Sequence, residues 1–150
     1  MTRWISLAAF LLLVMGGGAL IGSLTPPGAW YAGLAKPPYN PPSWVFGPVW
    51  TALYALIAVA GWRTFRRAPA GKAMAAWWTQ MALNFVWSPV FFLAHLPGLA
   101  LAVILAMLAA ILAFIALAWP RDRLSALLFL PYAAWVAFAA AVNAGVWWLN

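Results

Sequence analysis

Three tryptophans lie deep inside apolar stretches of the sequence, where their indole rings could stack on a flat ligand. Trp50, Trp87 and Trp135 each fall well away from the ends of the stretch that holds them. Interior rings of this kind also pack helices against each other without any ligand, so one such ring is weak evidence for a site. The polar residues near them strengthen the binding interpretation.

These polar neighbours repeat at helical spacing. Residues three or four positions apart share one face of a helix. Three such faces combine aromatic rings with amide, hydroxyl or small side chains: Phe46, Trp50 and Tyr54; Gln80, Asn84, Trp87 and Ser88; Trp135, Ala139 and Asn143. At about 1.5 Å per residue, Tyr54, Asn84 and Trp135 all lie about 12 to 17 Å from the nearest helix end. Polar groups at that depth usually face the interior of a bundle, so we expect the three faces to converge.

Convergence of these faces has two compatible interpretations. One is hydrogen bonding between helices, worth on the order of 1 kcal/mol per pair. The other is a cavity with aromatic walls, a few polar groups and a floor of small residues at Ala139 and Ala140, which suits a flat and largely apolar ring system. Pro89 and Pro131 each remove a helical hydrogen bond and would open space beside two of the tryptophans.

The sequence offers little for acid, base or metal chemistry. It has no Cys, a single acid, Asp122, and a single histidine, His95. No Lys, Asp or Glu falls inside an apolar stretch, which excludes a retinal Schiff base and a carboxylate proton relay. One histidine in a short turn makes no typical metal site, and no catalytic triad can be assembled. We therefore expect no metal and no required cofactor.

The amino-acid composition indicates that the helices which position these residues lie in a membrane. Of 150 residues, 68% are hydrophobic and 6% are charged, whereas a soluble domain carries charge on about a quarter of its positions. Stretches long enough to cross about 30 Å of hydrocarbon occur at residues 4–22, 45–62, 74–93, 99–119 and 124–149. The sequence predicts an all-α, multi-pass membrane protein: one domain over residues 1–150, built as a bundle of five transmembrane helices.

The distribution of Lys and Arg predicts the orientation. Lys36 lies alone on one side of the five-helix topology, and seven basic residues lie on the other: Arg3, Arg63, Arg66, Arg67, Lys72, Arg121 and Arg123. In a bacterial inner membrane this bias places the N-terminus in the cytoplasm. The bias does not decide between the inner and the outer membrane, because the rule does not apply to the outer membrane. Since the basic residues fall at the ends of apolar stretches, the net charge of +7 indicates topology and not a nucleic-acid partner.

The first connection between helices is long and rich in proline. Residues 24–42 hold six of the twelve prolines, with Trp30, Tyr31 and Tyr39 between them. Loops of this length in a small protein are usually functional. Paired prolines stiffen the backbone, so we expect a semi-rigid cover over the cavity, packed by its own aromatic residues.

Small residues could bring helices close together at two places. Gly18 and Gly22 form a G-x-x-x-G pattern, and a stripe of small residues follows on a later helix: Ala102, Ala106 and Ala110. Either pattern supports close packing inside the bundle or a dimer.

Three segments are similar to a known family: WYAGLAKPPYNPPSWVFGPVWTALY from Trp30 to Tyr54, NFVWSPVFF from Asn84 to Phe92, and PYAAWVAFAAAVN from Pro131 to Asn143. Together they resemble the TspO/MBR family, the tryptophan-rich sensory proteins related to the mitochondrial translocator protein, over nearly the whole chain. The resemblance implies a five-helix membrane protein, commonly a homodimer, with a pocket beneath the first long loop. It further implies that this pocket binds porphyrins such as protoporphyrin IX and haem, and in some members sterols and benzodiazepine-type ligands.

The resemblance also implies which residues form the pocket. By motif position these are Trp30, Phe46, Trp50, Tyr54, Asn84, Trp87, Trp135 and Ala139, with Asn143 nearby. Two departures from the family pattern stand out. No basic residue follows Arg123, so Tyr132 lacks the partner it would have in the proposed sterol motif of vertebrate members, which lowers the expectation of tight sterol binding. Pro38 and Tyr39 stand where several members have a second tryptophan.

Three functions are consistent with these features. The leading hypothesis is a porphyrin receptor or sensor that regulates tetrapyrrole or stress physiology. The first alternative is an enzyme that degrades porphyrin with light or oxygen; Trp50 and Trp135 would be its redox-active rings, because the expected pocket holds no acid or base. The second alternative is a porphyrin transporter, although the sequence shows neither a repeat nor a coupling carboxylate.

Overall fold

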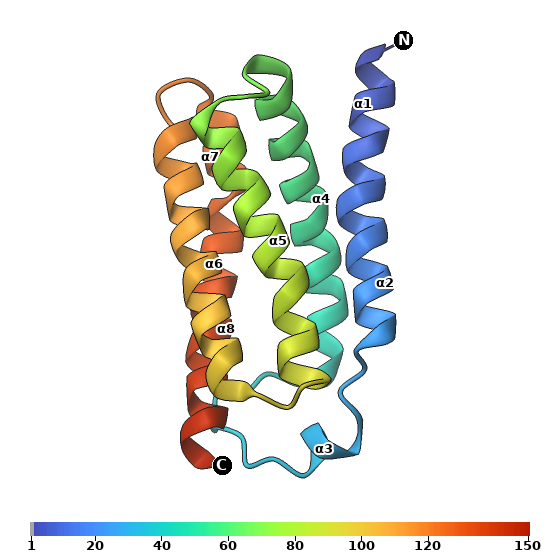
Figure 1. Cartoon of the computed structure of the whole chain (residues 1–150), viewed down its shortest axis with the longest axis vertical. Coiled ribbons are helices and arrows are strands. Elements are labelled where there is room, and N and C mark those ends of the chain that lie inside the picture. The colour runs from blue at the N-terminus through green and yellow to red at the C-terminus, as the bar shows by residue number, and fades with distance from the viewer. Residues whose placement is uncertain (1) are drawn as a thin grey trace.

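The computed structural model describes residues 2–150, and helices joined by loops make up this range. The first rod consists of α1 (Thr2–Leu11), a π-helical turn η1 (Leu12–Gly16) and α2 (Gly17–Leu24), and the short helix α3 (Gly28–Ala32) follows. Three single helices come next: α4 (Ser43–Arg67), α5 (Lys72–Phe92) and α6 (Pro97–Ala118). The last rod consists of α7 (Arg123–Leu128) and α8 (Leu130–Leu149). The rods form one bundle, with the two termini at opposite ends (Figure 1).

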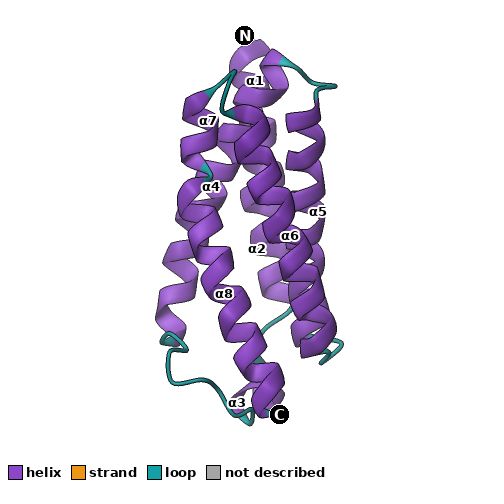
Figure 2. Cartoon of the chain, turned by 90° about the vertical axis from the view of Figure 1, so that its left-hand side faces the viewer, coloured by secondary structure: helices purple, strands orange, loops and turns teal. Residues whose placement is uncertain are grey.

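Four of the rods are long and apolar enough to cross a membrane: Thr2–Leu24, Ser43–Arg67, Pro97–Ala118 and Arg123–Leu149. These rods make the chain an integral, multi-pass membrane protein. The sequence predicts five spans, and the remaining rod, α5, meets the length but carries polar residues along it: Thr79, Gln80, Asn84 and Ser88. α5 runs beside α4 and α6 in the bundle (Figures 1 and 2).

The last rod is interrupted where the sequence predicts a continuous helix over residues 124–149. Phe129, with φ −87° and ψ −11°, separates α7 from α8. Pro131 lies in the first turn of α8, where its missing N–H costs no helical hydrogen bond. The sequence predicted a kink at Pro131, and the structure instead has a break at Phe129, two residues earlier. Pro89 lies inside α5, near its end. The loop over residues 24–42 likewise differs from expectation, because it contains α3.

Gly18 lets two helices approach closely inside the bundle. A Cβ atom at this position would lie 2.2 Å from the ring of Tyr54 on α4, which is far too close for any side chain. Gly22, the other glycine of the G-x-x-x-G pattern, has no atom within 4 Å of such a Cβ. Of the two uses the pattern allows, Gly18 serves packing within the chain.

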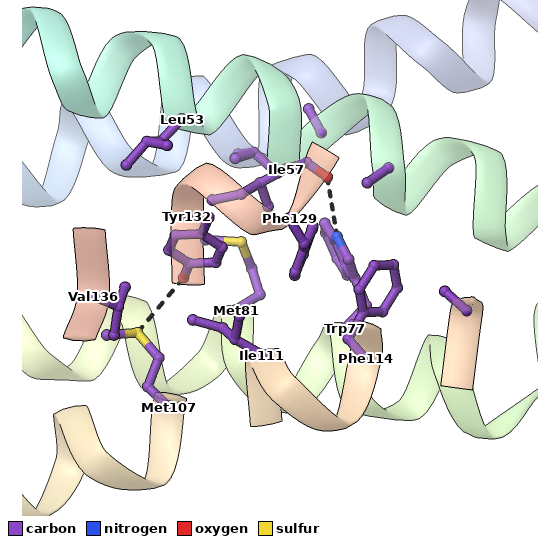
Figure 3. Packing of buried hydrophobic residues seen from close by; sticks show 14 of the residues in the cluster. Leu53, Ile57, Trp77, Met81, Met107, Ile111, Phe114, Phe129, Tyr132 and Val136 are labelled. Carbon is purple, nitrogen blue, oxygen red and sulfur yellow. Dashed lines mark hydrogen bonds between the residues drawn. The ribbon is translucent and has the colours of Figure 1, made fainter. Parts of the chain in front are cut away.

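Large buried side chains form a core that begins in the half of the bundle near the N-terminus and extends to Met107 and Tyr132, and part of it is drawn in Figure 3. Trp77 is fully buried and donates its indole hydrogen to the carbonyl oxygen of Ile57 at 3.0 Å. The rings of Phe114 and Phe129 meet at a centroid distance of 4.1 Å, which joins α6 to the break before α8.

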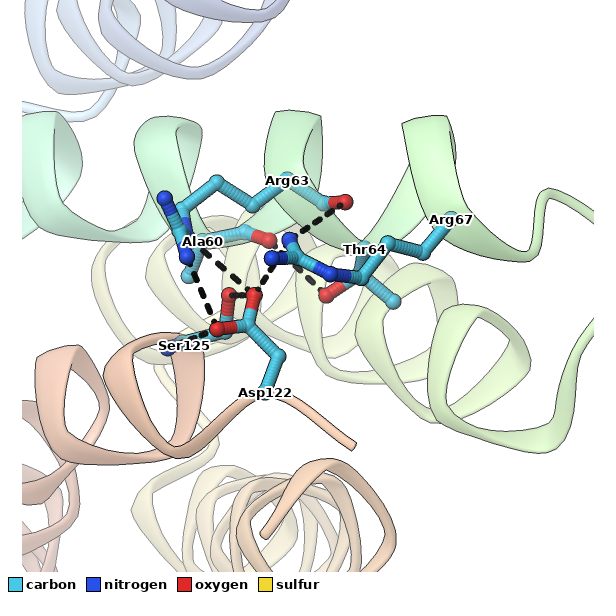
Figure 4. Close-up of polar contacts among 6 residues, drawn as sticks. All are labelled: Ala60, Arg63, Thr64, Arg67, Asp122 and Ser125. Carbon is cyan, nitrogen blue, oxygen red and sulfur yellow. Dashed lines mark hydrogen bonds and ion pairs between the residues drawn. The ribbon is translucent and has the colours of Figure 1, made fainter. Parts of the chain in front are cut away.

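An ion cluster around the buried carboxylate of Asp122 closes the end of the bundle near the N-terminus (Figure 4). Asp122 accepts hydrogen bonds from Arg63 at 3.1 and 2.9 Å and from Arg67 at 2.8 Å, and it also binds Ser125. Burial acts to raise the pKa of Asp122, but the hydrogen bonds from Arg63 and Ser125 and the charges of both arginines outweigh burial and lower that pKa to about 2. The cluster ties α4 to the start of α7.

Candidate ligand-binding cavity

The half of the bundle next to the first loop encloses a cavity of about 360 Å³. This volume lies in the lower part of the range of about 300 to 1,000 Å³ that is common for small-molecule sites. The walls come from α2, α4, α5, α6 and α8, and Tyr31 and Asn40 reach it from the first loop. Eight of the nine predicted site residues line the cavity: Phe46, Trp50, Tyr54, Asn84, Trp87, Trp135, Ala139 and Asn143.

Aromatic rings from α4 and α8 line this cavity. Trp135 on α8 meets Phe46 on α4 edge to face, with ring centroids 6.0 Å apart and an interplanar angle of 75°. Trp50 lies one turn further along α4, and its ring centroid is 5.3 Å from that of Tyr54. No Asp, Glu, Lys, Arg or His belongs to the described lining, so the cavity offers an apolar surface with aromatic faces.

A chain of hydrogen bonds fixes the polar groups at the inner end of the cavity. Tyr54 Oη donates to Asn84 Oδ1 at 3.1 Å, and Asn84 Nδ2 donates to Tyr132 Oη at 2.8 Å. Tyr132 Oη in turn donates to Gln80 Oε1 at 2.8 Å, and both of these residues are fully buried. The expected convergence of α4, α5 and α8 at this depth is confirmed, and the chain presents Tyr54 and Asn84 to the cavity in fixed orientations.

Tyr132 is the member of this chain that sequence reasoning did not assign to the site. Helical spacing could have assigned Tyr132 to the site, because Tyr132 lies three residues before Trp135 and shares its helix face. Gln80 lies on the predicted polar face of α5, but it is buried beneath the cavity and does not line it.

Asn143 links three helices at the outer end of the cavity. Its Oδ1 accepts a hydrogen bond from Trp87 Nε1 at 3.0 Å, and its Nδ2 donates to the carbonyl oxygen of Pro97 at 2.8 Å. Both polar ends of the amide are therefore used, and Trp87 is held against α8. The indole nitrogen of Trp135, by contrast, is buried and has no hydrogen-bond partner within residues 2–150.

Trp30 is the predicted site residue that does not line the cavity. Its ring stacks on exposed His95 in the turn between α5 and α6, with centroids 4.1 Å apart and planes at 13°. The next residue, Tyr31, lines the cavity instead and packs edge to face on Phe91 and Phe92. Trp30 thus holds the loop to the α5 to α6 turn, and Tyr31 occupies the position that the sequence predicted for Trp30.

Two further lining residues form a polar pair that joins α2 to α5. Thr25 Oγ1 and Ser88 Oγ lie 2.6 Å apart, and Thr25 Oγ1 also donates to the carbonyl oxygen of Ile21. Ser88 belongs to the predicted polar face of α5, whereas no sequence pattern pointed to Thr25. From α6, Ile104 and Met107 complete the wall, and nothing distinguished them in a helix that is apolar on all sides.

The second half of the first loop is fastened to α8, and the aromatic residues of the loop pack on the bundle, not on one another as the sequence predicted. The side-chain amide of Asn150 donates to the carbonyl oxygen of Ala35 at 2.9 Å and accepts from its N–H at 3.0 Å. Tyr39 Oη donates to the carbonyl oxygen of Ala141 at 3.2 Å. These contacts hold the loop across the end of the bundle that contains the cavity (Figure 2).

Comparison with known proteins agrees with this architecture. The chain matches the model of the TspO/MBR family over residues 9–149. It is 37% identical over 133 residues to Protein CrtK of Rhodobacter capsulatus, which covers 86% of this chain and 83% of that protein. It is 37% identical over 132 residues to the tryptophan-rich sensory protein of Cereibacter sphaeroides, covering 88% and 84%, and 38% identical over 124 residues to the human translocator protein, covering 79% and 73%. The chain therefore belongs to the TspO/MBR family of membrane proteins.

Proposed function

We propose that this protein is a membrane receptor that binds porphyrins, with protoporphyrin IX and haem as ligands, and regulates tetrapyrrole or stress physiology. The observation that carries the proposal is the cavity without charged lining residues that the rings of Trp50, Phe46 and Trp135 line together. Aromatic faces around a largely apolar space suit a flat ring system. The name of one relative, tryptophan-rich sensory protein, supports a sensory role.

Other ligand classes of the family are weaker candidates for this chain. In the vertebrate sterol motif a tyrosine and a basic residue act together. Here Tyr132 is fully buried in the hydrogen-bond chain beneath the cavity, and no basic residue follows Arg123. Benzodiazepine-type ligands remain compatible with an aromatic cavity of this size.

The proposed receptor has five spans, with α5 as the fifth. In a bacterial inner membrane, its basic end and N-terminus lie in the cytoplasm and the cavity lies under the first loop on the other side. We further propose a homodimer, for which exposed Ala102 and Ala106 on α6 would permit close packing between helices.

The test of porphyrin binding is a titration of the purified protein with protoporphyrin IX in the dark, followed by quenching of tryptophan fluorescence. Ala139 lines the cavity, so Ala139→Leu fills part of the space that the ligand needs. The matched control is Ala75→Leu, at an exposed position on α5 that does not line the cavity. We expect saturable binding that Ala139→Leu weakens by roughly fivefold or more and Ala75→Leu leaves unchanged. Absence of saturable binding, or equal affinities for all three proteins, would contradict the proposal.

A second candidate function is porphyrin degradation driven by light or oxygen. The observation that favours it is that Trp50 and Trp135 line the same cavity, while the Trp50 ring lies 5.3 Å from Tyr54 and 6.4 Å from Tyr132. Illumination of bound protoporphyrin IX should then change its absorption spectrum in the wild type. The Trp50→Phe, Trp135→Phe double variant should leave the spectrum stable, and equal bleaching in both proteins would show that the indoles are not the reactive groups.

A further inference from the structure

A second hollow, shallow and open to the surface, lies in the first loop outside the cavity. Its lining includes Lys36, Gly28 and three prolines of the loop. Four residues line both spaces: Pro27, Tyr31, Asn40 and Ser43. The inner cavity and the outer hollow therefore meet at a common rim.

Lys36 brings a fixed positive charge to this hollow. Its Nζ donates to the carbonyl oxygens of Tyr31 at 2.7 Å and Leu34 at 3.2 Å, and lies 4.5 Å from the centroid of the Tyr31 ring. These contacts hold the ammonium group beside Tyr31, which belongs to the common rim. An ammonium has three donors, and the two bonds to carbonyl groups leave one donor for another acceptor.

No acidic side chain compensates this charge. Asp122 is the single acid of the sequence, and it forms ion pairs with Arg63 and Arg67. That cluster lies at the end of the bundle near the N-terminus, whereas the first loop crosses the opposite end (Figure 1). The partners of Lys36 within the described residues are neutral, so its charge is available to an anionic ligand group.

We infer that Lys36 binds an ionised carboxylate at the edge of the ligand while the apolar ring system occupies the inner cavity. The inference rests on the proposed function and narrows its ligand class to flat apolar rings that carry a carboxylate at one edge. The ring would lie against Trp50 and Trp135, and the carboxylate would accept a charge-assisted hydrogen bond from Lys36 at the rim. A ring without the carboxylate would keep the aromatic contacts and lose this bond.

The experiment compares protoporphyrin IX with its dimethyl ester, which has the same ring but no ionised carboxylate. Both are titrated in the dark into the wild type, Lys36→Met and Lys36→Arg, with Lys72→Met at the opposite end of the bundle as the matched control. We expect the wild type and the control to prefer the acid over the ester. Lys36→Met should weaken binding of the acid by roughly fivefold and leave binding of the ester unchanged, and Lys36→Arg should keep the preference.

Each contrary result has a separate meaning. If Lys36→Met weakens the acid and the ester equally, Lys36 acts only by holding the loop through Tyr31 and Leu34, and the inference is overturned. If the wild type binds acid and ester with equal affinity, the inference is overturned while porphyrin binding stands. If the wild type binds neither compound saturably, the proposed function is overturned together with the inference.

Discussion

Trp135 and Ala139 lie one turn apart on α8, and together they shape one wall of the cavity. The indole supplies an aromatic face, and the alanine methyl group leaves the space beside it open. Edge-to-face packing on Phe46 positions the Trp135 ring, since its indole nitrogen has no hydrogen-bond partner in the described part of the chain. The sizes of the Trp135 ring and of the Ala139 methyl group therefore set the space that this wall leaves for a ligand.

We predict that Trp135→Ala weakens protoporphyrin IX binding by roughly 1 kcal/mol or more, because one stacking surface is lost. The measurement is a dark titration followed by the absorption spectrum of the porphyrin, which does not depend on the removed fluorophore. Trp119→Ala is the control, since Trp119 is part exposed at the basic end of α6 and far from the cavity in the chain fold. A folded Trp135→Ala variant with wild-type affinity would show that this ring is a packing residue only.

Contacts between helices depend on small groups at a few positions. Gly18 on α2 touches the Tyr54 ring of α4, and Tyr54 in turn donates to Asn84 of α5. At the other end, Asp122 joins the start of α7 to Arg63 and Arg67 of α4. These two sets of contacts hold α4 in place at the cavity end and at the solid end.

We predict that Gly18→Ala destabilises the protein by about 1 to 3 kcal/mol, because the new methyl group would overlap the Tyr54 ring. Gly22→Ala is the matched control one turn later, where a Cβ meets nothing within 4 Å. This control should be neutral or slightly more stable, since alanine favours the helix by up to about 1 kcal/mol. Melting temperatures in the same detergent provide the measurement, and equal values for both variants would contradict the close contact.

We predict that the ion cluster stabilises the protein above about pH 4 and loses this contribution at lower pH. The pKa of Asp122 is about 2 in the folded protein, below its value of about 3.9 in an unfolded chain. Folding therefore favours the charged carboxylate. Because Arg63 and Arg67 are part exposed and water screens their charges, about 1 kcal/mol of stability is lost as the pH falls from about 4 to about 2.

Asp122→Asn tests this pH dependence, because asparagine does not titrate. The difference in melting temperature between the wild type and Asp122→Asn should be largest at pH 7 and should shrink at pH 3. A difference that is the same at both values would mean that the carboxylate charge contributes nothing.

The whole molecule is asymmetric along its long axis. Large side chains fill the half near the N-terminus, and that end carries the ion cluster and most of the basic residues. The other half holds the cavity, and the proline-rich loop crosses it (Figures 1 and 2). A solid half of this kind allows the cavity half to stay open, because the helices remain fixed relative to one another at one end.

We predict that Ala70 and Ala94, which flank α5 and are both exposed, lie on opposite sides of the membrane. The sequence has no Cys, so Ala70→Cys and Ala94→Cys each introduce a single reactive thiol. In intact bacterial cells with the protein in the inner membrane, an impermeant maleimide should label Ala94→Cys, and it should label Ala70→Cys only after permeabilisation. Labelling of both from one side would show that α5 does not cross the membrane.

The sequence by itself determined the membrane setting and eight of the residues that line the cavity. The hydrophobic content identified the setting, because few charged groups can be placed in hydrocarbon. Helical periodicity and depth were enough to bring Trp50, Tyr54, Asn84 and Trp135 together, since side chains at one depth on inward faces of neighbouring helices must meet. These conclusions need only the period of the helix and the thickness of the bilayer.

Only the tertiary structure decided which of several equivalent neighbours makes each contact. Trp30 and Tyr31 are adjacent aromatic residues of one loop, and the position of His95 on another turn decides which of them faces the cavity. Gly18 differs from Gly22 because the Tyr54 ring of α4 lies against one and not the other. Each of these outcomes depends on side chains that are distant in the sequence. Local periodicity carries no information about which distant side chain makes the contact.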